Sequence, residues 1–114
     1  MISSAIIILA ITAVGGVLLA TKVLAGKQAP WFLSIVHALL GATGLILLSM
    51  AAIESDWAGR ISASLTLLVI AALGGFYLAS FHLRGNVSPK GIVLIHAGVA
   101  VVGFLSLLTV YFKI

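Results

Sequence analysis

The chain alternates between four long apolar stretches and three short polar connections. Each stretch holds about 20 residues, which is enough to cross a bilayer core of about 30 Å at a helical rise of about 1.5 Å per residue. Because the connections are short, successive helices are expected to be antiparallel neighbours. The pattern predicts a single domain over residues 1–114, an all-α up-down bundle of four transmembrane helices near Ile2–Leu24, Trp31–Ala52, Ile61–Leu83 and Gly91–Phe112.

Composition supports an integral membrane protein, since 63% of the residues are hydrophobic and only 7% are charged. The chain has no cysteine, which excludes disulfides and thiolate metal ligands. The net charge of +4 is spread over the helix ends, so no basic face for a nucleic acid is expected. The first span lacks a basic leader and is longer than the core of a signal peptide, which indicates a structural helix.

The charged residues predict an orientation. The first and third connections carry basic residues only, whereas the second connection holds both acids of the chain. Short basic connections favour the cytoplasmic side, so we expect a bacterial inner-membrane protein with both termini outside. Trp31 and Trp57 are expected to anchor opposite interfaces. The basic residues on the first side are Lys22, Lys27, Arg84 and Lys90, and the charged residues on the other side are Arg60, Lys113, Glu54 and Asp56.

The two halves of the chain align without a gap when one is shifted by 59 positions, over about residues 12–55 and 71–114. Each copy contains two spans, so both copies enter the membrane in the same sense, related by a pseudo-two-fold axis along the membrane normal. The bundle is therefore expected to be a duplicated helical hairpin, with equivalent residues at equal depth. The rarer matches are Gly15 with Gly74, Gly16 with Gly75, Gly26 with Gly85, Pro30 with Pro89, His37 with His96, and Gly44 with Gly103.

His37 and His96 are the strongest candidates for a functional site, because ionisable residues inside a bilayer are costly and usually functional. They lie on the second and fourth helices, which are diagonal in a sequential bundle and roughly 11–14 Å apart. Two imidazoles reaching inward leave space for one flat metallocycle ligated on both faces. A hydrogen-bonding role between helices is the alternative for either histidine alone.

Two histidines without cysteine, buried acid or a third ligand make a poor zinc site, which expects four ligands or three plus water. Haem iron needs only the two imidazoles. A six-coordinate iron has no open position, which favours electron transfer over oxygen chemistry. The sequence therefore predicts one haem b per chain with His37 and His96 as axial ligands.

Six glycines are expected to make room for the ring. Gly15, Gly16, Gly74 and Gly75 lie near the level of the histidines on the two helices without ligands. Gly44 and Gly103 lie seven residues beyond each histidine, about 10.5 Å deeper on nearly the same face. The alternative is that these glycines only bring helices together.

His82 has no counterpart in the repeat, because Val23 occupies the equivalent position. It is expected roughly 10 Å closer to the basic side than the ligand pair. Together with Lys22, Lys27, Arg84 and Lys90, it is a candidate to receive the two haem propionates, which need cations or hydrogen-bond donors. An ordinary interfacial side chain is the alternative for His82.

The paired segments "VHALLGATG" and "LIHAGVAVVG" resemble the ligand helices of four-helix b-type membrane cytochromes. That group includes the transmembrane ascorbate-reducible cytochromes and each four-helix half of haem A synthase. The resemblance implies that facing histidines hold haem b inside the membrane, a role carried here by His37 and His96. The chain departs from these families in having one level of paired histidines, and in lacking the buried glutamate of haem A synthase.

We therefore expect a minimal cytochrome that transfers single electrons, with lipid around it and with a quinol or a redox protein as partner. An electron-transfer role is favoured over a catalyst with its own substrate chemistry. Two alternatives remain at this point: an accessory or scaffold subunit of a larger membrane complex, and a small multidrug-type transporter. The first span lacks the acid such transporters use. A homo-oligomer is compatible with the sequence.

Overall fold

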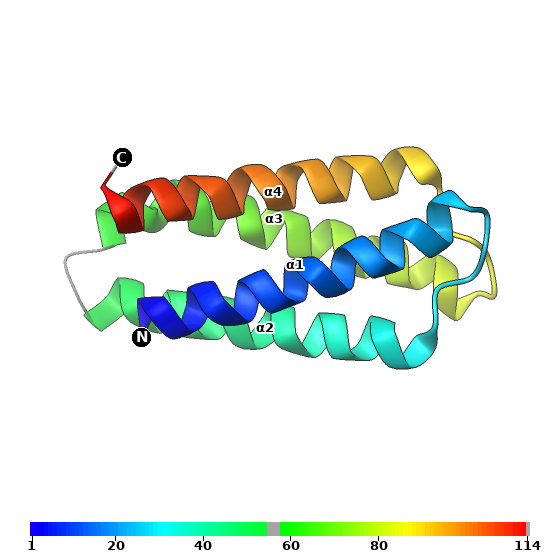
Figure 1. The fold of residues 1–114 in the computed structure, drawn as a ribbon, viewed down its shortest axis with the longest axis horizontal. Coiled ribbons are helices and arrows are strands. Elements are labelled where there is room, and N and C mark those ends of the chain that lie inside the picture. The colour runs from blue at the N-terminus through cyan, green and yellow to red at the C-terminus, as the bar shows by residue number, and fades with distance from the viewer. Residues whose placement is uncertain (55–57, 114) are drawn as a thin grey trace.

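The computed structural model describes residues 1–54 and 58–113 and is an up-down bundle of four helices. These are α1 (Ile2–Leu24), α2 (Trp31–Glu54), α3 (Ala58–Leu83) and α4 (Lys90–Phe112) (Figure 1). All four are long and apolar enough to cross a membrane. The predicted fold class is confirmed, and the predicted helix limits agree within three residues. Trp57 and Asp56, expected at the terminal side, lie outside the described residues.

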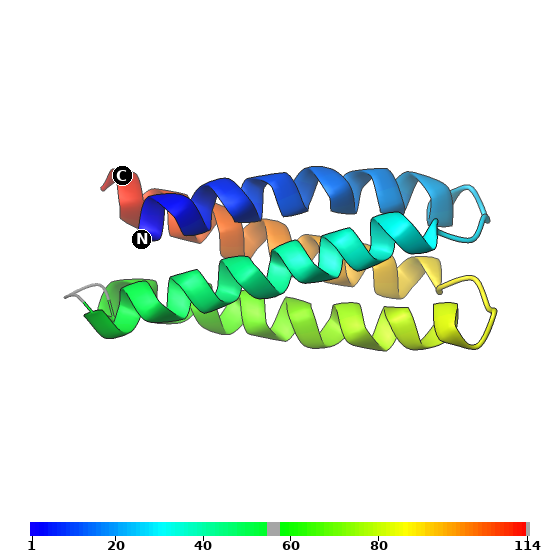
Figure 2. The same ribbon diagram turned by 90° about the horizontal axis from the view of Figure 1, so that it is seen from below.

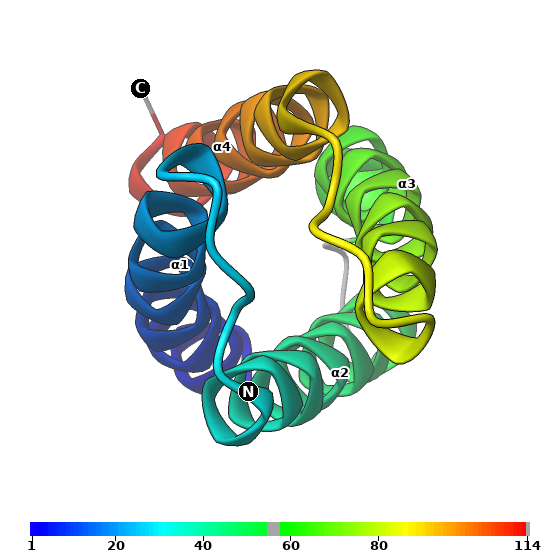
Figure 3. The ribbon, with the colours of Figure 1, turned by 90° about the vertical axis from the view of Figure 1, so that its right-hand side faces the viewer.

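The four helices surround a common axis in sequence order, with α1 beside α2 and α4, and α3 beside α2 and α4 (Figure 3). The helices of each hairpin pack most closely. In the described part of the chain, α2 and α4 have no Cα atoms within 8 Å of each other, so they are diagonal as expected. The bundle measures 44 × 22 × 18 Å, long enough to span a bilayer core.

Both hairpins turn in the same way at the end of the bundle that lies opposite the chain termini (Figure 2). Gly26 and Gly85 have φ values of 78° and 75°, a left-handed conformation that glycine adopts without steric cost. Their amides donate to the carbonyls of Val23 and His82, which satisfies carbonyl groups at the helix ends. Both connections are six residues long. We call this end of the molecule the loop end and the opposite end the terminal end.

The closely packed core lies towards the terminal end. Its cluster contains pairs related by the shift of 59 positions, such as Leu9 with Leu68 and Leu48 with Leu107. Large apolar side chains on the outer faces are exposed, among them Phe32 at 82% and Ile53 at 83%, as expected for helices that face lipid. The buried cluster is Ala5, Leu9, Leu48, Ile61, Leu68 and Leu107.

Candidate metal centre

His37 and His96 are fixed by equivalent hydrogen bonds that each ring donates to the neighbouring helix of its own hairpin. Nδ1 of His37 on α2 lies 2.9 Å from the carbonyl oxygen of Thr12 on α1. Nδ1 of His96 on α4 lies 2.7 Å from the carbonyl oxygen of Ala71 on α3. A carbonyl oxygen only accepts, so Nδ1 carries the ring proton in both residues and Nε2 presents its lone pair. Metal-ligating histidines commonly donate their second nitrogen in this way.

Glycine pairs on α1 and α3 provide the space for these imidazoles. A Cβ atom added at Gly16 would lie 2.9 Å from Cε1 of His37, and one at Gly75 would lie 3.1 Å from Cε1 of His96. At Gly15 and Gly74, the added Cβ would lie 3.7 Å from Nδ1 of the same two histidines. The four glycines therefore seat the two imidazoles against the helix backbone. That they also line a haem stays a prediction.

The two imidazoles lie close together across the diagonal of the bundle in an edge arrangement. Their ring centroids are 6.4 Å apart and their planes are inclined by 79°. With metal–nitrogen bonds of about 2.0–2.1 Å and roughly 1.1 Å from nitrogen to centroid, two imidazoles on opposite sides of one metal have centroids about 6.3 Å apart. Among the described residues, neither Nε2 atom has a hydrogen-bond partner. The donor set and the separation therefore fit one metal held between two histidines.

In the part of the chain that the structure describes, no third protein ligand accompanies this pair. Within residues 1–54 and 58–113, no three His, Cys, Asp or Glu side chains come together in a way that could hold a metal ion. A bare metal that expects four protein ligands is therefore poorly matched. Haem iron takes four of its six bonds from the porphyrin, so two axial histidines complete its coordination.

Gly44 and Gly103 have a packing role in the structure. A Cβ at Gly44 would lie 2.6 Å from Cδ2 of Leu9, and one at Gly103 would lie 3.1 Å from atoms of Leu67 and Leu68. Both glycines are buried and let the two helices of a hairpin approach closely. Helix packing therefore explains why these glycines occur on the ligand helices, nearer the terminal end than the histidines. A contact between these glycines and haem stays a prediction.

The structure gives the surroundings of His82, Arg84 and Lys90, three of the expected propionate residues, and their role towards a propionate stays a prediction. His82 stacks on Trp31 of α2, with ring centroids 3.7 Å apart and planes inclined by 12°. The guanidinium of Arg84 lies 4.8 Å from the centre of the Phe81 ring and bonds to Ser80, so it is held against its own helix. Lys90 is exposed at the start of α4.

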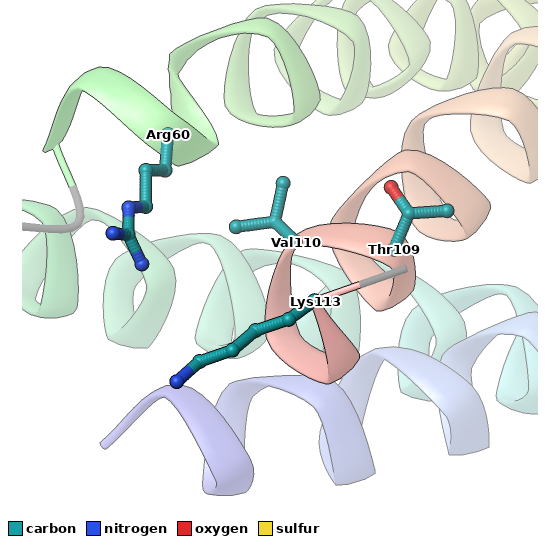
Figure 4. Close-up of a pocket in the computed structure, with 4 residues that line it drawn as sticks. All are labelled: Arg60, Thr109, Val110 and Lys113. Atoms are coloured by element: carbon teal, nitrogen blue, oxygen red, sulfur yellow. The ribbon is translucent and has the colours of Figure 1, made fainter.

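Three features of the structure were not predicted from the sequence. The carbonyl acceptors of Thr12 and Ala71 are backbone atoms, which have no residue-type signal. Trp31 was expected only as an interfacial anchor, and its stacking on His82 depends on how α2 and α3 meet. A depression lined by Arg60, Thr109, Val110 and Lys113 lies at the terminal end, far from the histidines (Figure 4).

No family model, no curated protein and no solved structure matches this chain.

Proposed function

We propose that the protein is a b-type cytochrome of the membrane that binds one haem b between His37 and His96 and transfers single electrons. One observation supports this most directly: two imidazoles from diagonal helices have ring centroids 6.4 Å apart, and each is anchored through Nδ1 to a backbone carbonyl. Because each Nδ1 donates its proton to a carbonyl, each Nε2 keeps a lone pair that is available to a metal. When bound, the haem iron would supply a one-electron couple between the ferric and ferrous states.

The residues around the pair have separate tasks in this proposal. Gly16 and Gly75 leave room for the imidazoles, because a side chain at either position would displace the ring. Lys90 at the start of α4 is the cation best suited to a propionate, since Arg84 is engaged with Ser80 and Phe81. Two axial histidines saturate the iron, so the expected chemistry is electron exchange rather than oxygen binding.

The proposed membrane orientation is that of a bacterial inner-membrane protein with the loop end in the cytoplasm. Support comes from the four basic residues in or beside the two loop-end connections, which contain no acid. His37 is the seventh residue of α2, so it lies about 9 Å from the loop-end start of that helix and about 25 Å from its other end. Haem would then sit nearer the cytoplasmic face. Single cysteines introduced by Lys27→Cys and Lys113→Cys, labelled with an impermeant reagent in inverted and intact vesicles, test the orientation.

The visible spectrum of the purified protein tests the proposed function. A bis-histidine cytochrome shows sharp low-spin bands on reduction, and a pyridine haemochrome assay identifies haem b and its ratio to protein. We expect one haem per chain in the wild type and in His82→Ala, which removes a histidine outside the pair. A wild-type protein that stays colourless when produced with excess haem would reject the proposal and favour a scaffold role.

A further inference from the structure

His82 breaks the symmetry of the bundle at one interior position. The other two histidines and the six glycines of the predicted site occur in equivalent pairs, such as His37 with His96 and Gly16 with Gly75. At the position of His82, the first hairpin has Val23, which is 6% exposed and apolar. The second hairpin has instead a half-buried imidazole, stacked on Trp31. Ionisable groups within membrane helices are usually functional. Because this one occurs in the second hairpin only, its function is expected on one side of the pseudo-two-fold axis.

The stack leaves the edge of the His82 ring available. Trp31 covers a face of the imidazole at 3.7 Å and fixes its plane within 12° of the indole. In the part of the chain that the structure describes, no hydrogen bond is made by either ring nitrogen. His82 therefore offers an oriented donor and acceptor edge without a protein partner, which is the arrangement a hydroxyl-bearing ligand would bind.

The position of this edge relative to the metal centre suits an electron donor. Gly75 contacts His96, and His82 follows it by seven residues on α3, so it lies about 10.5 Å nearer the loop end. The connections at the loop end have only six residues each. Trp31 is 45% exposed where α2 meets α3, so the stack is open to a lipid-soluble molecule.

We infer that His82 and Trp31 form the binding site for the headgroup of a quinol, with His82 as the acceptor of its proton. The inference rests on the proposed haem function. A quinol hydroxyl hydrogen-bonds to the free ring nitrogen of His82. Each one-electron oxidation of the quinol breaks one O–H bond: the proton passes to that nitrogen and then to water at the loop end, and the electron would pass to a ferric haem held by His37 and His96. Two such oxidations, with a one-electron acceptor that reoxidises the haem between them, would convert the quinol to the quinone and release two protons.

Photolabelling tests the binding site without depending on haem. An azido-ubiquinone is irradiated with the protein in its membrane, and labelled peptides are identified by mass spectrometry. We expect the label near His82 and Trp31, its loss on competition with short-chain ubiquinone, and at least about tenfold less labelling in His82→Ala. Val23→Ala, at the equivalent position of the other hairpin, should label as the wild type does. A label spread over the lipid-facing helices, or unaffected by His82→Ala, would overturn the site.

Rapid-mixing kinetics test the proton-accepting role. Anaerobic reduction of the haem by decylubiquinol should be about a hundredfold slower in His82→Ala and His82→Gln, the lower end of what a positioned proton acceptor contributes. Reduction by dithionite and the visible spectrum should stay unchanged, and Val23→Ala should react at the wild-type rate. His82→Gln preserves a hydrogen-bonding side chain, so a rate close to wild type in this variant would overturn proton transfer to His82.

The outcomes separate this inference from the proposed function. An intact spectrum with an unchanged quinol rate in His82→Ala overturns the quinol site and leaves the cytochrome standing. Loss of haem from His82→Ala alone assigns His82 to the cofactor and overturns the inference. A colourless wild type overturns the cytochrome and the quinol oxidation together, and the photolabel then decides whether a quinone binds at His82.

Discussion

The loop-end and terminal-end halves of the bundle use the same four helices but fill their interior differently. Towards the terminal end, leucines such as Leu9 and Leu48 form a closely packed cluster. In the loop-end half, the equivalent interior positions of α1 and α3 are glycines, and imidazoles occupy the space between the helices. Glycine weakens a helix by about 0.5–1 kcal/mol relative to alanine, so the loop-end half gives up local stability to seat its histidines.

The comparison indicates that the two halves of the bundle have different roles: the terminal-end half provides stability and the loop-end half holds the histidines. The leucine cluster holds the two hairpins together, so the histidine layer does not have to provide that stability. Backbone carbonyls then orient the imidazoles without any polar side chain that would need a partner of its own. If this interpretation is correct, substitutions in the loop-end half should change cofactor binding, and substitutions in the terminal-end half should change stability.

The largest expected effect comes from removing a ligand. His37→Ala or His96→Ala should abolish low-spin haem binding, because one imidazole cannot complete the coordination and each histidine has the same geometry. Haem content and the reduced spectrum measure the effect, with His82→Ala as the matched control. If either variant of the pair retains haem with an unchanged low-spin spectrum, the ligand assignment is wrong.

The next effect concerns the glycines that seat the imidazoles. Gly16→Leu and Gly75→Leu should lower haem content at least about tenfold, which corresponds to about 1.4 kcal/mol. An added Cβ alone would approach the imidazole to 2.9 Å or 3.1 Å, so the ring must shift, and the rest of a leucine side chain displaces it further. Gly98→Leu is the control, because nothing lies within 4 Å of a Cβ at that position on α4. Normal haem content in both Gly16→Leu and Gly75→Leu would show that these glycines serve only helix packing.

A smaller effect is expected in the terminal-end half at Gly44. Gly44→Ala places a Cβ 2.6 Å from Leu9, which should cost about 1–3 kcal/mol of unfolding free energy in detergent while haem is retained. The contact is with the end of a leucine side chain, so adding Leu9→Ala should recover part of the loss. Loss of haem from a Gly44→Ala protein that remains folded would show that this glycine also lines the cofactor.

The sequence predicted the fold and the pairing of the histidines because both depend on features that it contains directly. Long apolar spans specify the helices, and the 59-residue repeat puts His37 and His96 at one depth. The seating of each imidazole against a glycine pair was not predicted, since it follows from how closely the helices of a hairpin approach. The Trp31 stack was also missed: Trp31 aligns with Lys90 in the repeat, so symmetry gave no signal for an aromatic pair.

The smallest expected effect concerns Ser64, which is fully buried among leucines of the terminal-end half and donates a 3.0 Å hydrogen bond to Ser106. Its equivalent in the first hairpin is Ala5, which is also fully buried, so an apolar side chain is compatible with this position. Ser64→Ala should therefore lower the unfolding free energy by only about 0.6 kcal/mol, the mean for hydrogen bonds between membrane helices. The haem spectrum should not change.

A double-mutant cycle of Ser64→Ala with Ser106→Ala, followed by thermal unfolding in detergent, isolates the bond from the packing of each side chain. The control is Ser62→Ala, because Ser62 is exposed and bonds only to the Gly59 carbonyl of its own helix. A changed haem spectrum would mean that the Ser64–Ser106 hydrogen bond affects the geometry around His37 and His96. The division between a stabilising half and a cofactor half would then be wrong at this position, even if the leucine cluster behaves as expected.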